Sequence, residues 1–577
     1  MTTLKIFLVT YFFSFFLATT SLFAIDITTN WKFSKGDNPE WATTKFDDKA
    51  WMTVPLGVAW EIFLTEDYNG YAWYRKTLFI PSSMKKEVRK YGALYLNLGK
   101  IDDTDATYFN GKKLGQNGDF PPNYQGDYAK ERRYFIPASD IRWDENNVIA
   151  VRVFDNGGGG GMYEGNYQCA AVTWREKVAL AVSYPQDKSN FMDSQSTTVE
   201  IALHNESHET INGTITCEIS KYDGTPISEK SNPIAVSSDA VGKTMLRIEA
   251  LSPGFYILNA TFQGKDNVRL IFKKGFAVEP QKTLVAPTLP SDFNAFWEGN
   301  LAELTKVAPD YKIEKQINKC TVTHDVYLVE MRSLGNVRVH GWYAVPKKLK
   351  GRLPAILHVQ GYSSSLEPDT RETDFVTFSL NIRGHGNSKD DVDPGFPGYL
   401  WSGVEQKETY IYRGAYMDCI RAIDFLVSRS EVNTEKIVVE GGSQGGALSY
   451  VTAALDQRVH YCLADVPFLS DFPNYFKLAK WPANEFEKYV SKTKADWQKI
   501  YGVLNYFDIK NFTPRITCPV LMGVGLLDET CPPAINFAAF NNLASKDKNY
   551  LLYPTSGHAL SGEHGVLKMQ WLREKVK

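Results

Sequence analysis

Residues 436–455 read KIVVEGGSQGGALSYVTAAL, and this stretch decides the fold of the C-terminal half of the chain. Its first apolar residues predict a buried strand and its last ones a helix, with a sharp turn between them at GGSQGG. Glycines at positions 441, 445 and 446 let the strand and the helix approach closely. Ser443 would then stand above the sheet at the N-terminus of the helix, where developing negative charge is stabilised. The stretch therefore predicts a nucleophilic serine.

The sequence around this motif predicts a parallel sheet with crossover helices. After a proline-containing linker at residues 277–293, strand-like runs alternate with helical ones, of which residues 415–429 are an example. A serine on a strand-to-helix turn of such a sheet is typical of α/β hydrolases. Four runs are continuously apolar, as in strands buried on both faces: residues 354–360, 436–441, 519–525 and 549–554.

The histidines after Ser443 are the candidates for the general base, because a serine hydroxyl alone is weakly nucleophilic. The α/β hydrolases order their triad as serine, acid, histidine. His558 directly follows the last predicted strand in a loop of small residues, which is where the base belongs. His564 lies just beyond it and is the alternative. His460 falls early in a predicted strand, which favours a structural role.

Asp528 is the first carboxylate after the strand at residues 519–525, and it is the predicted acid of the triad. There it would hold the imidazole tautomer and stabilise the imidazolium. The adjacent Glu529 is the rival, and is otherwise a solvated loop charge. An oxyanion needs two preorganised donors. We expect these to be the backbone N–H groups of Gln444, next to the nucleophile, and of Tyr362, in the loop after an early strand.

Residues 25–175 and 176–280 predict two β-sandwiches ahead of this region. The first segment has alternating strand signals broken by turns, and its Asn110-Gly111 pair favours a tight hairpin because both positions tolerate positive φ. These features are typical of a sandwich or jelly roll. The second segment has the size and strand spacing of an immunoglobulin-like sandwich, which we interpret as a spacer. The α/β-hydrolase domain would then span residues 281–577.

Parts of the first segment resemble a known accessory domain. The stretches concerned are FDDKAWMTVPLG (46–57), GYAWYRKTLFIP (70–81), LGKIDDTDATYFNGKKLG (98–115) and NNVIAVRVFDNGGGGG (146–161). They resemble the sugar-binding-like jelly-roll domain attached to family 2 glycoside hydrolases and related bacterial enzymes. In that family the domain is often a structural accessory, so the resemblance leaves open whether this domain contacts carbohydrate.

A second resemblance covers nearly all of residues 285–577. Together the motifs of this region resemble the carbohydrate esterase family of acetyl xylan esterases and cephalosporin C deacetylases. The resemblance implies removal of acetyl groups from xylan, xylo-oligosaccharides or another acetylated glycan through an acetyl-enzyme intermediate. The motifs are PSDFNAFWEGNLAEL (290–304), HGWYAVPKK (340–348), QGYSSS (360–365), NIRGHGNS (381–388), ETYIYRGAYMDCIRAIDFL (408–426), GGSQGG (441–446), ADVPFLSDF (464–472), GLLDETCPP (525–533) and SGH (556–558).

The same resemblance implies roles for individual residues, and it implies no metal and no cofactor. The family's triad falls on Ser443, Asp528 and His558, its oxyanion hole on the N–H groups of Tyr362 and Gln444, and its small acyl pocket near Pro467 and Phe468.

Two positions depart from that family's pattern. Gln360 stands before the Gly-Tyr pair where the family usually has histidine, and His385 stands where it usually has glutamine. Neither supplies the triad, so the departures bear on pocket geometry and substrate choice, and we interpret His385 as a structural loop histidine. The family members are single-domain, ring-forming oligomers. The appended β domains leave open whether this chain forms a homo-oligomer.

The amino-acid composition limits the class of protein and the partners that this chain can have. The 577 residues predict three or four units, and 43% hydrophobic with 23% charged residues is typical of folded soluble protein. A net charge of −2 without a basic stripe argues against nucleic acid as a partner. An aromatic content of 13% is compatible with a sugar ligand. Seven cysteines without a CxxC or Cys/His cluster argue against a disulfide framework or a zinc site.

The first 24 residues predict a cleaved signal peptide. Lys5 precedes an apolar run at residues 6–17, and small residues lead to a cleavage site after Ala24. The run is short for a membrane span, although an uncleaved anchor helix is the alternative. Because no second long apolar stretch follows, we expect a mature chain without a membrane span, either secreted or periplasmic.

The same residues bear on other possible functions. An esterase or peptidase of this fold acting on another substrate would keep the triad, but an oligopeptidase would normally carry β-propeller repeats, and the sequence has no such repeat. A non-catalytic carbohydrate-binding protein would not need the complete set of serine, acid and histidine. A glycoside hydrolase would need a barrel with paired carboxylates. The triad indicates acyl transfer, and only the resemblance indicates acetyl.

Overall fold

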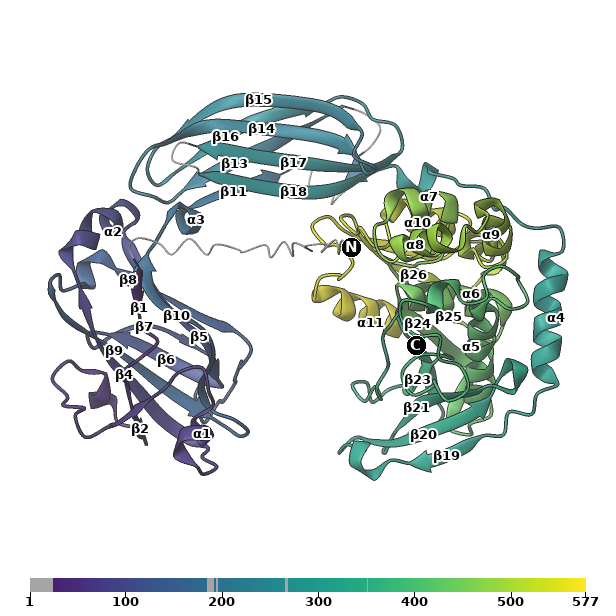
Figure 1. Cartoon of the computed structure of the whole chain (residues 1–577), viewed down its shortest axis with the longest axis horizontal. Helices are drawn as coiled ribbons and strands as arrows, with labels where there is room; N and C mark the ends of the chain where they lie inside the picture. Colours follow the sequence, from purple (N-terminus) through teal and green to yellow (C-terminus); the bar gives the residue numbers. More distant parts are fainter. Residues whose placement is uncertain (1–23, 184–190, 193–195, 265–267, 350, 577) are drawn as a thin grey trace, which may run out of the picture.

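The structure, a computed structural model, describes residues 24–183, 191–192, 196–264, 268–349 and 351–576. Figure 1 shows three bodies, two β-sandwiches and an α/β body, with the second sandwich joining the other two. The predicted fold class of two sandwiches followed by an α/β hydrolase is confirmed. The predicted signal peptide lies outside the described residues, except for Ala24 at the start of the first strand.

The first sandwich consists of a four-stranded sheet, β1-β10-β5-β8, and a six-stranded sheet, β3-β2-β4-β9-β6-β7. Residues of β8 alternate between exposed and buried, so every second side chain joins the core between the sheets. Asn110 and Gly111 turn the chain between β6 and β7 with φ angles of 50° and 84°, which confirms the predicted hairpin. The elements are β1 (Ala24–Asp26), β2 (Trp31–Lys35), β3 (Met52–Val54), α1 (Trp60–Leu64), β4 (Gly70–Ile80), α2 (Lys85–Tyr91), β5 (Ala93–Asp102), β6 (Thr104–Phe109), β7 (Lys112–Asn117), β8 (Glu131–Pro137), β9 (Glu145–Asp155), β10 (Gly161–Ala171) and α3 (Trp174–Lys177).

The second sandwich packs a three-stranded sheet, β11-β13-β16, against a five-stranded sheet, β12-β18-β17-β14-β15. Inward-facing residues of β13, β14, β16 and β17 form one hydrophobic core between the sheets. Its strands are β11 (Val178–Ser183), β12 (Phe191–Met192), β13 (Thr197–Asn205), β14 (Ile211–Lys221), β15 (Pro226–Val236), β16 (Ala240–Ile248), β17 (Gly254–Gly264) and β18 (Arg269–Val278).

The α/β body contains a nine-stranded sheet in the order β19-β20-β21-β23-β22-β24-β25-β26-β27. Six neighbouring strands run parallel, namely β23, β22, β24, β25, β26 and β27. Beyond β23, the strands β21, β20 and β19 extend the sheet as antiparallel strands. The four predicted strands are β22, β24, β26 and β27. The strands are β19 (Lys312–Lys315), β20 (His324–Arg332), β21 (Arg338–Pro346), β22 (Leu353–Val359), β23 (Val376–Asn381), β24 (Val432–Gly442), β25 (Tyr461–Asp465), β26 (Val520–Gly525) and β27 (Lys548–Tyr553).

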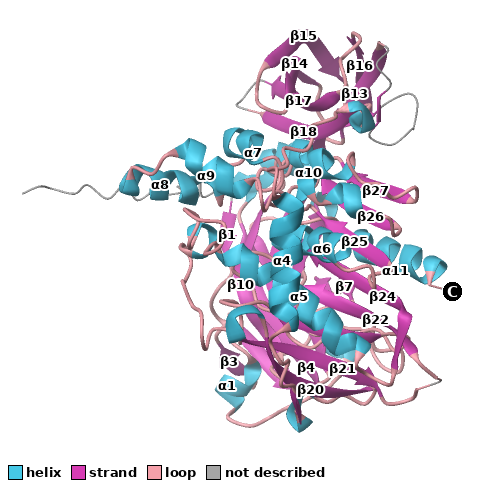
Figure 2. Cartoon of the chain, turned by 90° about the vertical axis from the view of Figure 1, so that its right-hand side faces the viewer, coloured by secondary structure: helices cyan, strands magenta, loops and turns pink. Residues whose placement is uncertain are grey.

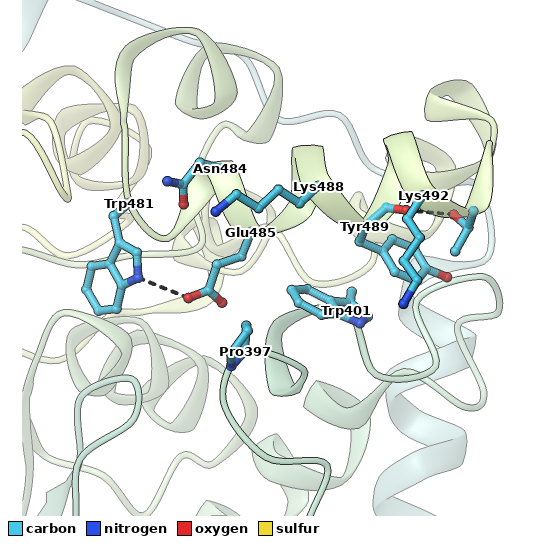
Figure 3. A pocket seen from close by; sticks show the side chains of 9 residues that line it. Pro397, Trp401, Trp481, Asn484, Glu485, Lys488, Tyr489 and Lys492 are labelled. Atoms are coloured by element: carbon cyan, nitrogen blue, oxygen red, sulfur yellow. Dashed lines mark hydrogen bonds between the residues drawn. The ribbon is translucent and has the colours of Figure 1, made fainter. Parts of the chain in front are cut away.

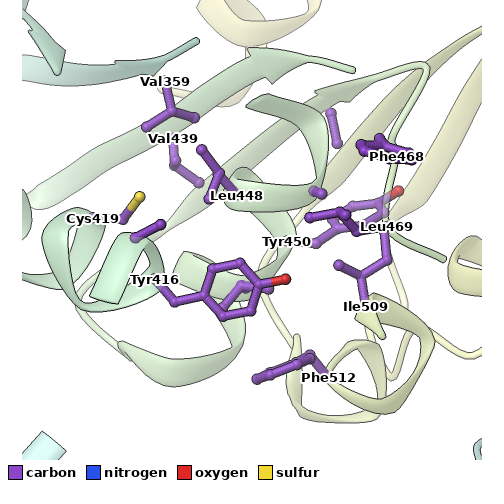
Figure 4. Packing of buried hydrophobic residues seen from close by; sticks show 14 of the residues in the cluster. Val359, Tyr416, Cys419, Val439, Leu448, Tyr450, Phe468, Leu469, Ile509 and Phe512 are labelled. Carbon is purple, nitrogen blue, oxygen red and sulfur yellow. The ribbon is translucent and has the colours of Figure 1, made fainter. Parts of the chain in front are cut away.

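Helices cover both faces of this sheet. α5 and α6 pack on one face, and Figure 4 shows side chains from both helices and from β24 meeting in the core. α11 covers the opposite face, where Leu572 packs with Val438 and Leu521. In Figure 2, α4 and α5 cross in front of the strands. The helices are α4 (Phe293–Thr305), α5 (Ile411–Val427), α6 (Gln444–Leu455), α7 (Phe472–Leu478), α8 (Ala483–Thr493), α9 (Trp497–Leu504), α10 (Pro533–Phe540) and α11 (Glu563–Lys575).

The loops that follow the parallel strands emerge at one edge of the sheet, because the carboxyl ends of parallel strands lie together. Each of these loops carries a residue that the sequence analysis singled out. The loop after β22 holds Tyr362, the one after β24 Ser443, the one after β25 Pro467 and Phe468, the one after β26 Asp528, and the one after β27 His558. The candidate site is therefore assembled at this edge.

Candidate active site

Ser443 occupies the single residue between the end of β24 and the start of α6, as the sequence predicts. Its φ and ψ angles are 60° and −121°, a strained combination for a residue with a side chain. Two backbone hydrogen bonds hold it there. The Ser443 N–H donates to the Asp465 carbonyl at 2.8 Å, and the Phe468 N–H donates to the Ser443 carbonyl at 3.0 Å. The strain is thus maintained by the neighbouring strand β25 and the loop after it.

Glycines beside the serine are required by close backbone contacts. A Cβ atom on Gly445 would lie 2.3 Å from the Val359 carbonyl oxygen, and one on Gly441 would lie 2.6 Å from the same atom. A Cβ atom on Gly446 would lie 2.7 Å from the Asp465 carbonyl oxygen. Real Cβ atoms do not come this close to backbone, so α6 can approach the strands only where it has no side chains.

Asp528 and His558 are hydrogen-bonded to each other. The Asp528 side chain is fully buried, and its Oδ2 lies 2.9 Å from His558 Nδ1. Its Oδ1 accepts hydrogen bonds from the N–H groups of Thr530 and Cys531, both at 2.9 Å. The carboxylate is therefore fixed by three donors, and it selects the imidazole tautomer with hydrogen on Nδ1. The imidazole is 35% exposed, so part of the ring is open to solvent.

The Ser443 hydroxyl contacts a thiol in this structure. Among the described residues, its Oγ has its hydrogen-bond contact with Cys531 Sγ, at 3.8 Å, and none with His558. Burial raises the pKa of the Cys531 thiol well above its usual range, so the sulfur remains a neutral neighbour. Catalytic hydrogen bonds are often long or misaligned before substrate binds, so this geometry is compatible with a serine–histidine pair.

The N–H groups of Tyr362 and Gln444 are both available as donors. In the part of the chain that the structure describes, neither donates to another protein group. Gln444 begins α6, where the first N–H groups have no partner within the helix. Tyr362 is held by its side chain, whose hydroxyl donates to Glu485 Oε2 at 2.7 Å. These features suit two donors aimed at a shared anionic oxygen.

Pro467 and Phe468 lie directly beside the serine turn. Besides the bond from Phe468 N–H to the Ser443 carbonyl, a Cβ atom on Gly446 would come within 3.0 Å of the Pro467 Cα. Asn536 of α10 donates from Nδ2 to the Pro467 carbonyl at 2.8 Å. The Phe468 ring is buried against Tyr475 of α7, with ring centroids 5.0 Å apart. The loop therefore forms a closely packed wall beside the serine turn.

The sequence model of the family described as "Acetyl xylan esterase (AXE1)" matches residues 281–575, just over half of the chain. The chain belongs to this family. The resemblance drawn from the motifs of the C-terminal region is confirmed.

Several individual proteins are similar to this chain in sequence or in structure. An acetyl esterase of Xylanibacter ruminicola, Axe7A, is 32% identical over 339 residues, which cover 56% of this chain and 75% of that protein. A solved acetyl xylan esterase from Paenibacillus sp. R4 is 30% identical, with a TM-score of 0.49, and covers 51% of this chain and 98% of its own. A β-glucuronidase from Bacteroides uniformis is 15% identical, with a TM-score of 0.29, over 87% of this chain and 52% of its own.

The other residues of this esterase that the sequence analysis considered as base or acid make different contacts. His564 Nε2 is 2.7 Å from Asp465 Oδ1, and its Nδ1 is 2.8 Å from the Tyr553 hydroxyl. His460 precedes β25 and lies 3.8 Å from Glu435. Glu529 pairs with Lys480 at the surface, at 3.1 Å. None of the three joins the serine turn in the part of the chain that the structure describes.

A buried hydrogen-bond network behind Ser443 was not predicted from the sequence. The Gln444 side chain accepts a hydrogen bond from the Tyr412 hydroxyl at 2.7 Å, and its Nε2 lies 3.3 Å from His385 Nε2. Burial lowers the pKa of His385 to about 4, so the ring is neutral and accepts this bond, while Nδ1 faces the Arg383 carbonyl at 3.4 Å. The prediction of a structural role for His385 fits these contacts. The network ties α6 to α5 and to the loop after β23.

An aromatic opening beside Tyr362 was also missed. Figure 3 shows Trp481, Glu485 and Trp401 around it, with Trp481 Nε1 donating to Glu485 Oε1 at 2.9 Å. The Trp481 ring is 43% exposed, and its centroid lies 5.9 Å from that of Tyr362. These residues come from α8 and from two separate loops, so no local sequence pattern marks them as one surface.

Two groups of side chains in the described residues have a geometry that could hold a metal ion. Asp528, Cys531 and His558 form one, but the carboxylate is already bonded to the imidazole and to two backbone N–H groups, and the Cys531 sulfur contacts Ser443. Asp102, Asp103 and Asp155 of the first sandwich form the other, with oxygens within 4.8 Å of one another.

We predict that Gly445→Ala disrupts the serine turn. The added methyl group must displace the Val359 carbonyl or α6, and misplacing a reacting group by about 1 Å can lower the rate by about 100-fold. The measurement is kcat/KM on p-nitrophenyl acetate. The matched control is Gly502→Ala in α9, where a Cβ meets nothing within 4 Å. Equal activity of the two variants would contradict the steric argument.

We predict that His385 makes the stability of the α/β body depend on pH. Its pKa is about 4 in the folded protein instead of the ordinary 6.5, so the unfolded chain binds more protons between these values and stability falls as the pH is lowered. From neutral pH to about pH 5 the loss is about 2 kcal/mol. Urea unfolding at both pH values should show a smaller loss in His385→Gln. The same loss in both proteins would exclude His385 as its source.

Proposed function

We propose that Ser443, His558 and Asp528 are the catalytic triad of this carbohydrate esterase, which removes acetyl groups from xylan. Family membership establishes the reaction class, and the observation that carries the residue assignment is the bond between Asp528 and His558 beside the strained serine turn. The substrates we propose are acetylated xylan, xylo-oligosaccharides and related O-acetylated glycans. Membership of the acetyl xylan esterase family and the similarity to the acetyl esterase of Xylanibacter ruminicola support this choice.

In the proposed mechanism, the Ser443 Oγ attacks the carbonyl carbon of the acetyl ester while His558 Nε2 takes its proton. Asp528 stabilises the imidazolium through Nδ1. The oxyanion that forms is bound by the N–H groups of Tyr362 and Gln444. Collapse of this intermediate breaks the bond to the sugar oxygen, which receives the proton from His558 and leaves as a hydroxyl. The acetyl group is now on Ser443.

The second half of the reaction repeats these roles with water. His558 takes a proton from water as the water oxygen attacks the acetyl-enzyme, and the N–H groups again bind the oxyanion. Acetate leaves and the proton returns to Ser443. Pro467 and Phe468 would limit the acyl group to a small one, because their loop packs directly against the serine turn. This wall supports a preference for acetyl over butyryl esters.

We also propose a signal peptide and domain boundaries for this chain. Residues 1–24 would be a signal peptide that is cleaved during export, followed by domains at residues 25–175, 176–280 and 281–577. No helix in the described part of the chain is long and apolar enough to cross a bilayer. N-terminal sequencing of the protein recovered from the culture medium or periplasm tests the cleavage site.

We predict that Ser443→Ala abolishes release of acetate from acetylated xylan. Without the hydroxyl no acetyl-enzyme can form, and the loss should reach about 10³-fold or more. The assay measures acetate from acetylated xylan alongside p-nitrophenyl acetate and butyrate, with circular dichroism as the control for folding. Activity on the small esters but not on xylan would redirect the substrate to another acetylated glycan. Folded wild-type protein without activity on any ester would refute the proposed site.

We predict that Asp528→Asn lowers kcat by about 10³–10⁴-fold, because an amide selects the wrong imidazole tautomer and does not stabilise the imidazolium. The matched control is Glu529→Gln, which changes the adjacent carboxylate at a surface pair with Lys480. That control should retain the wild-type kcat. Reversal of the two results would make Glu529 the acid.

A further inference from the structure

The second sandwich contacts the α/β body at the loops that carry the acid and the base. Tyr222, in the turn between β14 and β15, donates from its hydroxyl to the backbone carbonyl of Asp528 at 2.5 Å. The two residues are 306 positions apart in the chain. The Tyr222 ring is half-buried against the core of the α/β body, and burial raises the pKa of its hydroxyl, which keeps it a donor.

A second contact involves the loop that leads to the base. Gly275 of β18 donates from its N–H to the Pro554 carbonyl at 2.8 Å, four residues before His558. A Cβ atom on Gly275 would lie 2.4 Å from the Leu526 carbonyl oxygen, two residues before Asp528. The edge of β18 and the ends of β26 and β27 are thus in direct backbone contact. Only glycine permits this approach.

A third contact completes the interface. Phe255 of β17 packs against Phe537 of α10 with ring centroids 5.3 Å apart, and it is buried in the hydrophobic core of the α/β body. The Phe255 carbonyl also accepts the Tyr222 N–H at 3.0 Å, which fixes the turn that presents Tyr222. The apolar contact therefore anchors the domain, and the two hydrogen bonds reach the catalytic loops.

We propose that the second sandwich is a working part of the esterase, in which Tyr222 is a positioning residue that holds Asp528 in line with His558. The inference rests on the proposed triad. Asp528 carries its bond to His558 on its side chain and its bond to Tyr222 on its own carbonyl, so the two hydrogen bonds constrain the same residue from both sides. This role goes beyond the spacer interpretation drawn from the sequence.

The test compares Tyr222→Phe with Tyr256→Phe. Both remove one hydroxyl from the same domain, but the Tyr256 hydroxyl donates to the Ser252 carbonyl, inside the sandwich, at 2.7 Å. We expect Tyr222→Phe to lower kcat on p-nitrophenyl acetate about three- to tenfold with KM unchanged, the range that one hydrogen bond accounts for. Its rate of labelling by a fluorophosphonate probe at Ser443 should fall by the same factor. Tyr256→Phe should match wild type in both assays.

Active-site titration normalises each rate to the folded enzyme, which separates positioning from a loss of stability. Gly275→Ala is the second variant, and we expect its kcat to fall about tenfold or more, because its methyl group must displace Leu526 or the sandwich. Wild-type kcat and labelling rates in both Tyr222→Phe and Gly275→Ala would overturn the inference. Ser443→Ala and Asp528→Asn in the same assays keep the outcomes distinct, since an active Ser443→Ala would refute the proposed triad itself.

Discussion

The contact between the first turn of α6 and the end of β22 sets the geometry on which the rest of the site depends. Gly445 approaches the Val359 carbonyl so closely that no side chain fits between them. The two residues before Gly445 are Ser443 and Gln444, and the loop after Val359 leads to Tyr362. One backbone contact therefore fixes the hydroxyl and both N–H groups relative to one another. Electrostatic stabilisation by preorganised donors requires this kind of rigidity.

A second contact of the same kind operates on the other side of the site. A Cβ atom on Gly525, at the end of β26, would lie 2.0 Å from the Gly557 carbonyl oxygen, next to His558. The Leu527 N–H also donates to the Ser556 carbonyl at 2.9 Å. The backbone alone thus holds the loops of Asp528 and His558 close together. The bond between Asp528 and His558 then completes an arrangement that the backbone already imposes.

Much of this site could be predicted because its signals are local. The turn at Ser443 follows from small residues between an apolar strand and a helix. Asp528 comes shortly after the buried strand β26, and His558 comes shortly after the apolar edge strand β27. Contacts between distant segments left no such signal. The thiol of Cys531 beside Ser443, the neutral His385 behind Gln444 and the aromatic opening around Trp481 all depend on how loops meet across the sheet.

The lack of a local signal also explains why the sequence of the second sandwich indicates only a spacer. Apolar and polar residues alternate along its strands, as in any β-sandwich. None of its residues forms a catalytic pattern along the chain. The hydrogen bond of Tyr222 joins it to a residue 306 positions away. A tyrosine in a hairpin turn is otherwise an ordinary surface residue, so only the packed structure distinguishes it.

The position of that partner has a consequence for how the protein is made. A ribosome adds about 5–20 residues per second, so roughly 15–60 s separate the synthesis of Tyr222 from that of Asp528. Domains generally fold as units in the order of synthesis. The second sandwich can therefore be complete before the last strands of the sheet exist, and it offers those late segments a finished surface to fold against. The earlier domain would act as a template built into the same chain.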